Sequence, residues 1–145
     1  MQTFLPYPDF AESARVLDNK RLGKQRVEAY QILLTLDGAR KGWANHPAVK
    51  MWEGYQTALF VYLQAVCSEW VYRGYKDTVL RKGTHYMAPE EFMTTRQGGF
   101  VTMPPWLGDK EFHAAHRANL LRKDYGHYAQ FGWDEDLTLP YVWPK

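Results

Sequence analysis

The sequence contains few of the features that mark secreted, membrane-spanning or zinc-binding proteins. It has a single cysteine, Cys67, which excludes an internal disulfide and any four-cysteine zinc site. It has no uninterrupted apolar stretch of roughly 18 residues, so no membrane span is predicted. Residues 1–10 lack the basic segment and the apolar run of a signal peptide. From these absences we expect an intracellular protein of the cytoplasm or nucleoid, with no membrane partner.

An excess of charge of one sign is also lacking. The formal net charge is +2, which gives no general argument for nucleic-acid binding, so basic residues matter only where they cluster. Hydrophobic residues make up 46% of the chain and charged residues 23%, a composition that supports one core and argues against disorder. The 145 residues are about the length of one domain, and we expect a single domain over residues 1–145.

Aromatic residues, by contrast, are abundant, with six tryptophans and ten tyrosines. Most of these rings are expected to pack in the core or at interfaces. The alternative for some of them is an exposed surface on which nucleic-acid bases stack.

Three segments have the apolar spacing and the capping residues of helices. They cover residues 18–37, 45–74 and 110–123, and the second, the longest, is expected to be the spine of the fold. Asp18 can cap the first segment, Asn45 or His46 can cap the second, and Gly74 is expected to end the second. Residues 78–105 are rich in glycine and proline and predict a long irregular connection, with one helical turn near residues 88–93. No segment alternates as a strand does. We therefore predict a mainly α fold, a compact single domain of about three principal helices with long irregular loops. The tail, 134–145, is expected to run extended over the surface.

The first helical segment contains a ladder of basic residues that ends in an acid. Lys20, Lys24 and Glu28 recur at steps of four and therefore share one helical face. Arg21 borders that face, and Arg26 follows it along the chain. Such a group can be an ordinary solvated surface, or it can follow the phosphates of DNA and release counterions. We predict DNA binding for Lys20, Arg21, Lys24 and Arg26.

The third helical segment holds a second basic group. Arg117, Arg122 and Lys123 lie there, with His113 and His116 beside them, and all five are predicted to contribute to DNA binding. The two histidines also have the helical spacing of a metal site, which leaves a metal-dependent or small-molecule enzyme as a further hypothesis. No compelling third ligand lies nearby in the sequence, so we expect neither a metal nor a cofactor.

Glu28 does not fit a surface that only binds DNA. A surface ion pair with Lys24 would stabilise the helix by only a few tenths of a kcal/mol. In a DNA groove, the carboxylate would repel phosphate, a cost without a use in a pure binding protein. A role in moving a proton or in stabilising a cationic intermediate would explain its position.

Three pieces of the sequence, taken in order, indicate a family. They are LDNKRLGKQRVEA, HPAVKMWEGYQTALFVYLQAVCSEWVYRGYKDT and HRANLLRKDYGHYAQFGW. Together they resemble the endonuclease V-type pyrimidine-dimer DNA glycosylases, small α-helical phage repair enzymes with AP-lyase activity. The first piece resembles the helix that holds the family's catalytic glutamate, and Glu28 fits that position. The second is similar to the long central helix and its RG…KDT turn. The third is similar to the final basic helix, where Arg117 matches a phosphate-binding arginine.

The resemblance implies a cofactor-free repair enzyme that acts on double-stranded DNA, and we expect it to do so as a monomer. In the family, the α-amino group of the chain attacks C1′ of the damaged nucleotide and forms a Schiff base, and the glutamate assists the proton transfers that lead to β-elimination. Met1 and Glu28 are the catalytic residues that this mechanism implies here. α-Amino groups as a class have pKa values of roughly 7.7–8.0, so a useful fraction is neutral at physiological pH.

This sequence departs from the family pattern in two places. Family members expose a threonine amine after the first methionine is removed, whereas Gln2 follows Met1 here, and Met1 is expected to be retained. Either the Met1 amine serves, or processing exposes Gln2 or Thr3, or lyase chemistry is lost. Residues 78–105 do not resemble the family, so the target could be another modified pyrimidine. A non-catalytic nucleic-acid-binding helical protein is the other alternative.

Overall fold

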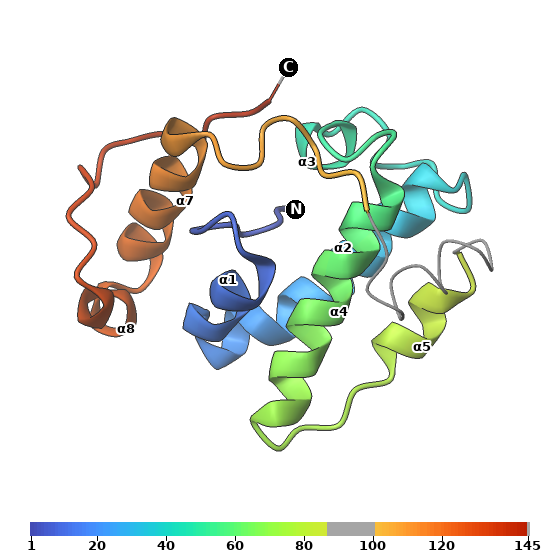
Figure 1. Cartoon of the computed structure of the whole chain (residues 1–145), viewed down its shortest axis with the longest axis horizontal. Helices are drawn as coiled ribbons and strands as arrows, with labels where there is room; N and C mark the ends of the chain where they lie inside the picture. Colours follow the sequence, from blue (N-terminus) through green and yellow to red (C-terminus); the bar gives the residue numbers. More distant parts are fainter. Residues whose placement is uncertain (87–100, 145) are drawn as a thin grey trace.

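The computed structural model describes residues 1–86 and 101–144 (Figure 1). The regular elements in these two ranges are helices, without a strand among them, which confirms the predicted mainly α fold. No helix within them is long and apolar enough to cross a membrane. The helical turn predicted at residues 88–93 lies outside the described residues. The helices are α1 (Phe10–Val16), α2 (Asn19–Leu36), α3 (Pro47–Lys50), α4 (Gln56–Tyr72), α5 (Val79–Thr84), α7 (Lys110–Lys123), α8 (Tyr125–Tyr128) and the 3-10 helix η1 (Ala129–Phe131).

Helices α2 and α4 pack against each other at the centre of the fold (Figure 1). As predicted, α2 follows the N-cap Asp18, whose carboxylate accepts a hydrogen bond from the backbone N–H of Arg21. A Cβ atom at Gly23 would lie 3.0 Å from the ring of Trp70, so this glycine allows α2 to approach α4 closely. The apolar residues that α2 buries in the core are Leu22, Ala29, Ile32 and Leu33.

The prediction of a single long helix over residues 45–74 is wrong, because this segment forms two helices, α3 and α4. Gly54 adopts a φ of +83°, in the left-handed region that a helix does not use. Tyr55, with φ −126° and ψ 37°, then precedes the first residue of α4. The predicted ends are correct. His46 caps α3, and Gly74 follows α4 in a left-handed conformation.

The short helices α1 and α5 were not predicted. In α1, the side chain of Asp9 caps the first turn by accepting a hydrogen bond from Glu12 N, and α1 packs on α4. In α5, inside the segment expected to be irregular, the backbone N–H groups of Val79 and Leu80 donate to Asp77. Both helices are short enough that their capping contacts, rather than apolar periodicity, define them.

The first residues of the chain run through the interior, between α7 on one side and α2 and α4 on the other (Figure 1). The N–H of Phe4 donates to Gln25 Oε1 on α2, and the carbonyl of Phe4 accepts a hydrogen bond from the hydroxyl of Tyr62 on α4. Leu5 is fully buried and is held from α7 by two histidines. These contacts fix the start of the chain against α2.

The C-terminal tail runs without regular structure from η1 back along α7, as predicted (Figure 1). The carbonyl of Leu139 accepts hydrogen bonds from Asn119 and Arg122, both on α7. This path brings Tyr141 and Trp143 close to the first residues of the chain.

Candidate active site

The start of the chain, the polar face of α2, the end of α7 and the tail surround a pocket of about 370 Å³. Such a volume lies within the range of sites for small molecules and single nucleotides. Six residues that the sequence indicated line it: Met1, Lys20, Arg21, Lys24, Glu28 and Lys123. The pocket therefore unites the predicted amine, the predicted carboxylate and four predicted cations.

Glu28 is the buried acid of this pocket, with 8% of its surface exposed. Its Oε2 accepts a hydrogen bond of 2.7 Å from the backbone N–H of Gln2. Its Oε1 lies 3.5 Å from Nζ of Lys24, whose side chain is 72% exposed. The carboxylate is thus not a surface partner of Lys24 alone, because it also holds the start of the chain.

Gln25 reinforces this attachment from the same face of α2. Its Nε2 donates to the carbonyl of Gln2 at 2.8 Å, and its Oε1 accepts the N–H of Phe4 at 2.9 Å. Three main-chain groups of residues 2–4 are therefore bound by Gln25 and Glu28, which are one helical turn apart. The geometry places the α-amino end of the chain beside the Glu28 carboxylate.

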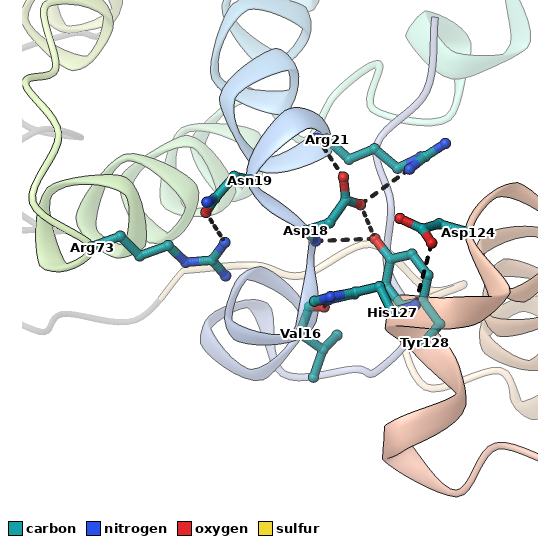
Figure 2. Close-up of polar contacts among 8 residues, drawn as sticks. All are labelled: Val16, Asp18, Asn19, Arg21, Arg73, Asp124, His127 and Tyr128. Atoms are coloured by element: carbon teal, nitrogen blue, oxygen red, sulfur yellow. Dashed lines mark hydrogen bonds and ion pairs between the residues drawn. The ribbon is translucent and has the colours of Figure 1, made fainter.

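A polar network orients Arg21 at the edge of the pocket (Figure 2). Its guanidinium donates to Asp18 at 3.2 Å, and the hydroxyl of Tyr128 on α8 donates to the same carboxylate. Burial alone would raise the pKa of Asp18, but the hydrogen bonds from Tyr128 and Arg21 hold it below its usual range. Asp18 therefore stays ionised and keeps Arg21 in place.

Two further contacts hold the end of α1 and the beginning of α2 (Figure 2). A ring nitrogen of His127 on α8 bonds the carbonyl of Val16, the last residue of α1, at 2.9 Å. Arg73, which directly follows α4, donates to Asn19, the first residue of α2, at 2.8 Å. The N-terminal turn of α2, which contains Lys20 and Arg21, is thereby fixed from two sides.

Sequence reasoning missed His46 as a pocket residue, although it identified the residue as a possible helix cap. Its Nδ1 accepts the N–H of Ala48 at 3.0 Å, which leaves the proton of the neutral ring on Nε2. Burial and the α-amino group at the chain start lower the pKa of His46, against the opposing effect of Glu28. His46 therefore lies close enough to the α-amino group for the charge of the amine to affect the pKa of the imidazole.

Tyr141 and Trp143, from the tail, complete the pocket wall and were also missed. The rings of Trp143 and His46 meet edge to face at 6.1 Å, and those of Tyr141 and His116 do so at 5.4 Å. Burial raises the pKa of Tyr141 to about 12, so its hydroxyl remains protonated. No local pattern could have indicated these residues, because the fold of the tail alone brings them here.

Comparison with known proteins decides the family. Residues 1–82 match the family described as pyrimidine dimer DNA glycosylase, and this is more than half of the 145-residue chain. The chain belongs to the pyrimidine dimer DNA glycosylase family. It is a DNA repair glycosylase, and its partner is DNA. The matched residues include the chain start, α2 and His46, whereas α7 and the tail lie beyond them. No curated protein and no solved structure matches the chain significantly.

Of the cations predicted to bind DNA in this glycosylase, Arg26 lies outside the pocket. Its guanidinium forms an ion pair with Asp77, and both side chains are almost buried, at 13% and 6% exposed. It also lies 4.4 Å from the ring of Trp70. The prediction that Arg26 binds DNA therefore needs correction. Its guanidinium is paired with Asp77 and packed on Trp70 inside the protein, so it is not presented to a phosphate. The helical face of α2 that holds Arg26 points to α4 and α5.

His113 and His116 also need correction, since both are buried, at 3% and 1% exposed. Nε2 of His113 accepts the N–H of Gly108 at 2.9 Å, so its Nδ1 is the donor to the carbonyl of Leu5 at 2.8 Å. Nδ1 of His116 accepts the N–H of Leu5 at 3.0 Å. The two rings hold the chain start rather than phosphate. Within the described ranges, no group of three or more candidate metal ligands occurs, and these histidines are committed to the backbone.

Arg117 and Arg122 hold the tail. Arg117 pairs with Glu135 and donates to the carbonyl of Pro6 at 2.8 Å. Arg122 donates to the carbonyl of Leu139 at 2.9 Å and also bonds the carbonyl of Leu137 and the side chain of Asn119. Their internal partners account for both guanidinium groups, so of the basic group on α7 only Lys123 lines the pocket.

The buried histidines predict a pH dependence of folding. Burial lowers the pKa of His116 from its ordinary value of 6.5 to about 3 and also lowers that of His113. Between about pH 3 and 6.5, the unfolded chain binds protons that the folded protein excludes, so the free energy of unfolding is expected to rise with pH. Urea unfolding at several pH values measures this slope. His116→Asn retains an acceptor for the N–H of Leu5 and should have a shallower slope of unfolding free energy against pH. His85→Asn, at an exposed site, is the control and should keep the slope of the unmodified protein. An unchanged slope in His116→Asn would contradict the argument.

Proposed function

We propose that the protein excises damaged pyrimidines, with pyrimidine dimers as the first expectation, from double-stranded DNA and then cleaves the strand at the resulting abasic site. The α-amino group of Met1 is the proposed nucleophile, and Glu28 is the proposed proton-transfer group. One observation supports this most strongly. A buried carboxylate in a pocket lined by cations is bonded to the backbone of the second residue, so it lies beside the amine.

The proposed reaction uses the α-amino group as the nucleophile and the Glu28 carboxylate to move protons. The amine nitrogen attacks C1′ of the damaged nucleotide, and the glycosidic bond breaks, so that the base leaves with the bonding electrons and takes up a proton. The sugar ring opens as O4′ takes up a proton, which gives a Schiff base between the nitrogen and C1′. Loss of a proton from C2′ then expels the 3′ phosphate by β-elimination, and water finally releases the amine.

Glu28 is suited to these proton transfers because its two oxygens have different surroundings. Oε2 is occupied by the N–H of Gln2, whereas Oε1 has the exposed Lys24 at 3.5 Å as its partner. Oε1 is therefore the oxygen that we assign to accept a proton from the amine and to return it later. General acid or base groups placed in this way contribute a factor of about 10² to 10⁴ to rates.

The cations around the carboxylate are the proposed phosphate contacts. Lys20, Arg21 and Lys24 approach from α2, and Lys123 approaches from the end of α7. A nucleotide must leave the base stack for chemistry at C1′, and the phosphates on either side of it then lie at the rim of the pocket. Cations at the rim would hold these phosphates while the sugar faces Glu28.

Reductive trapping tests the proposed chemistry. Borohydride reduces a Schiff base to a stable amine, so incubation with abasic duplex DNA and borohydride should give a covalent protein–DNA adduct. A duplex with a thymine dimer should be cleaved at the lesion, and the undamaged duplex of the same sequence should not. Specific binding to abasic DNA without any adduct would instead favour a non-catalytic DNA-binding protein.

Neutralising Lys24 tests the phosphate contacts. Lys24→Gln should weaken binding to duplexes of many sequences similarly and should lower the slope of log affinity against log salt by about one. Lys82→Gln, an exposed lysine on α5 away from the pocket, is the matched control and should leave the slope unchanged. Fluorescence anisotropy at several salt concentrations measures both. Equal slopes for Lys24→Gln and the unmodified protein would rule out a phosphate contact at this position.

A further inference from the structure

Gln2 lies inside the pocket with only 7% of its surface exposed. Its backbone groups are occupied, because the N–H donates to Glu28 and the carbonyl accepts from Gln25. Its side-chain Oε1 accepts the N–H of Thr3 at 2.9 Å. A backbone N–H can only donate, so the atom facing it must be the oxygen, and the orientation of the carboxamide is thereby fixed.

The remaining polar atom, Nε2, is buried and has no hydrogen-bond partner within the described part of the chain. Tyr141 lines the same pocket, and the side chain of Gln2 lies close enough to its hydroxyl for a weak hydrogen-bonding interaction to lower the pKa of Tyr141, against the larger effect of burial. The two groups do not reach full hydrogen-bond geometry, so Nε2 keeps its capacity to donate to another acceptor. Buried donors are nearly always satisfied, so a donor left open in a pocket is a candidate contact for a molecule that binds there.

The chemistry of the pocket narrows the choice of partner. Its charged donors, Lys20, Arg21, Lys24 and Lys123, suit phosphate oxygens. The carboxamide of Gln2, which lines the same pocket as Glu28, is a neutral donor and suits a neutral acceptor. Pyrimidine bases present carbonyl oxygens as acceptors, and the two bases of a dimer retain theirs.

We propose that Nε2 of Gln2 donates a hydrogen bond to a carbonyl oxygen of the damaged pyrimidine, and that this contact contributes to selecting the lesion. The inference rests on the proposed function, since it requires the damaged nucleotide to enter this pocket. It also gives Gln2 a role of its own. The residue contributes its backbone N–H to position Glu28 and its side chain to recognise the base, whereas the amine comes from Met1.

Replacing the carboxamide with an apolar group of similar size tests the proposal. Gln2→Met retains the backbone bond to Glu28 and loses the donor. For this variant, we expect the ratio of single-turnover rates on dimer-containing and abasic duplexes to fall about 3- to 10-fold, the value of one hydrogen bond, because an abasic site has no base to recognise. Gln2→Glu should lower the ratio further, since it places a carboxylate opposite a carbonyl. Gln64→Met, the same change on α4 outside the pocket, is the matched control.

Equal losses by Gln2→Met on both duplexes would overturn the inference, and so would an unchanged ratio. Circular dichroism and thermal unfolding verify that each variant folds, and Gln2→Asn, a shorter carboxamide, should recover part of the ratio if Nε2 is the donor. The proposed function can fail separately. If the unmodified protein forms no adduct with abasic DNA, the ratio of affinities for dimer-containing and undamaged duplexes replaces the ratio of rates. Gln2→Met should then lower that ratio by the same factor, and an unchanged ratio would refute the contact.

Discussion

Glu28→Gln is expected to lower single-turnover cleavage of dimer-containing and abasic duplexes by about 10² or more. The glutamine keeps an oxygen that can accept the 2.7 Å hydrogen bond from Gln2 N, so the start of the chain should stay in place. What it loses is the ability to take up and return a proton. DNA affinity should be retained or slightly higher, because removing a negative charge from a pocket lined by four cations reduces phosphate repulsion.

Binding to uncleavable DNA and cleavage must be measured side by side for this variant. Glu53→Gln is the matched control, because Glu53 is exposed and lies outside the pocket, and it should leave both quantities unchanged. If Glu28 only paired with Lys24 on the surface, its replacement would cost a few tenths of a kcal/mol of stability and no activity. Near-normal cleavage by Glu28→Gln would therefore disprove the assignment.

Much of the α2 side of this site could be predicted from the sequence, because helical periodicity is a local property. Steps of four place Lys20, Lys24 and Glu28 on one face, and the structure finds all three around one pocket. Burial of Glu28 could not be predicted in the same way. It depends on the first residues of the chain lying against α2, and no pattern within α2 specifies that contact.

The charges of α7 show where local reasoning fails. The sequence gives no reason to separate the three basic residues Arg117, Arg122 and Lys123. In the structure, Arg117 pairs with Glu135 and Arg122 donates to a carbonyl of the tail, and of the three only Lys123 lines the pocket. A guanidinium that binds phosphate and one that binds backbone carbonyls have the same sequence signature. What distinguishes them is the path of a tail more than ten residues away in the chain.

The missed residues and the broken helix have the same cause. His46 was recognised as a cap, but the pocket beside it is formed by the chain start and the tail, both distant in sequence. The apolar stripe through residues 45–74 continues across Gly54, so periodicity predicted one helix where a left-handed glycine makes two. The local signals, a capping residue and a helical apolar spacing, are both present. The position of the pocket and the break between α3 and α4 depend on tertiary structure, which these signals do not contain.

The amine can be identified by locating the borohydride adduct. After trapping on abasic DNA and proteolysis, mass spectrometry is expected to place the adduct on the α-nitrogen of Met1. Lysines are poorer candidates, since their side chains as a class have pKa values of roughly 10.4 and are protonated at physiological pH. Among the lysines that line the pocket, Lys24 forms an ion pair with the proposed proton-transfer group, since its Nζ lies 3.5 Å from Oε1 of Glu28. Lys24→Gln should therefore still form the adduct.

Moving the amine should abolish trapping altogether. A short glycine-serine extension before Met1 leaves Glu28, the cations and the Gln2 backbone bond unchanged but removes the α-amino charge that lowers the pKa of His46. Adduct formation should fall to background, and β-elimination at abasic sites by about 10² or more, while DNA affinity changes little. An adduct on Lys20, Lys24 or Lys123, or full trapping by the extended chain, would contradict the assignment. An adduct on Gln2 would instead mean that Met1 is removed, and it would place the reacting nitrogen on the atom that lies 2.7 Å from the Glu28 carboxylate.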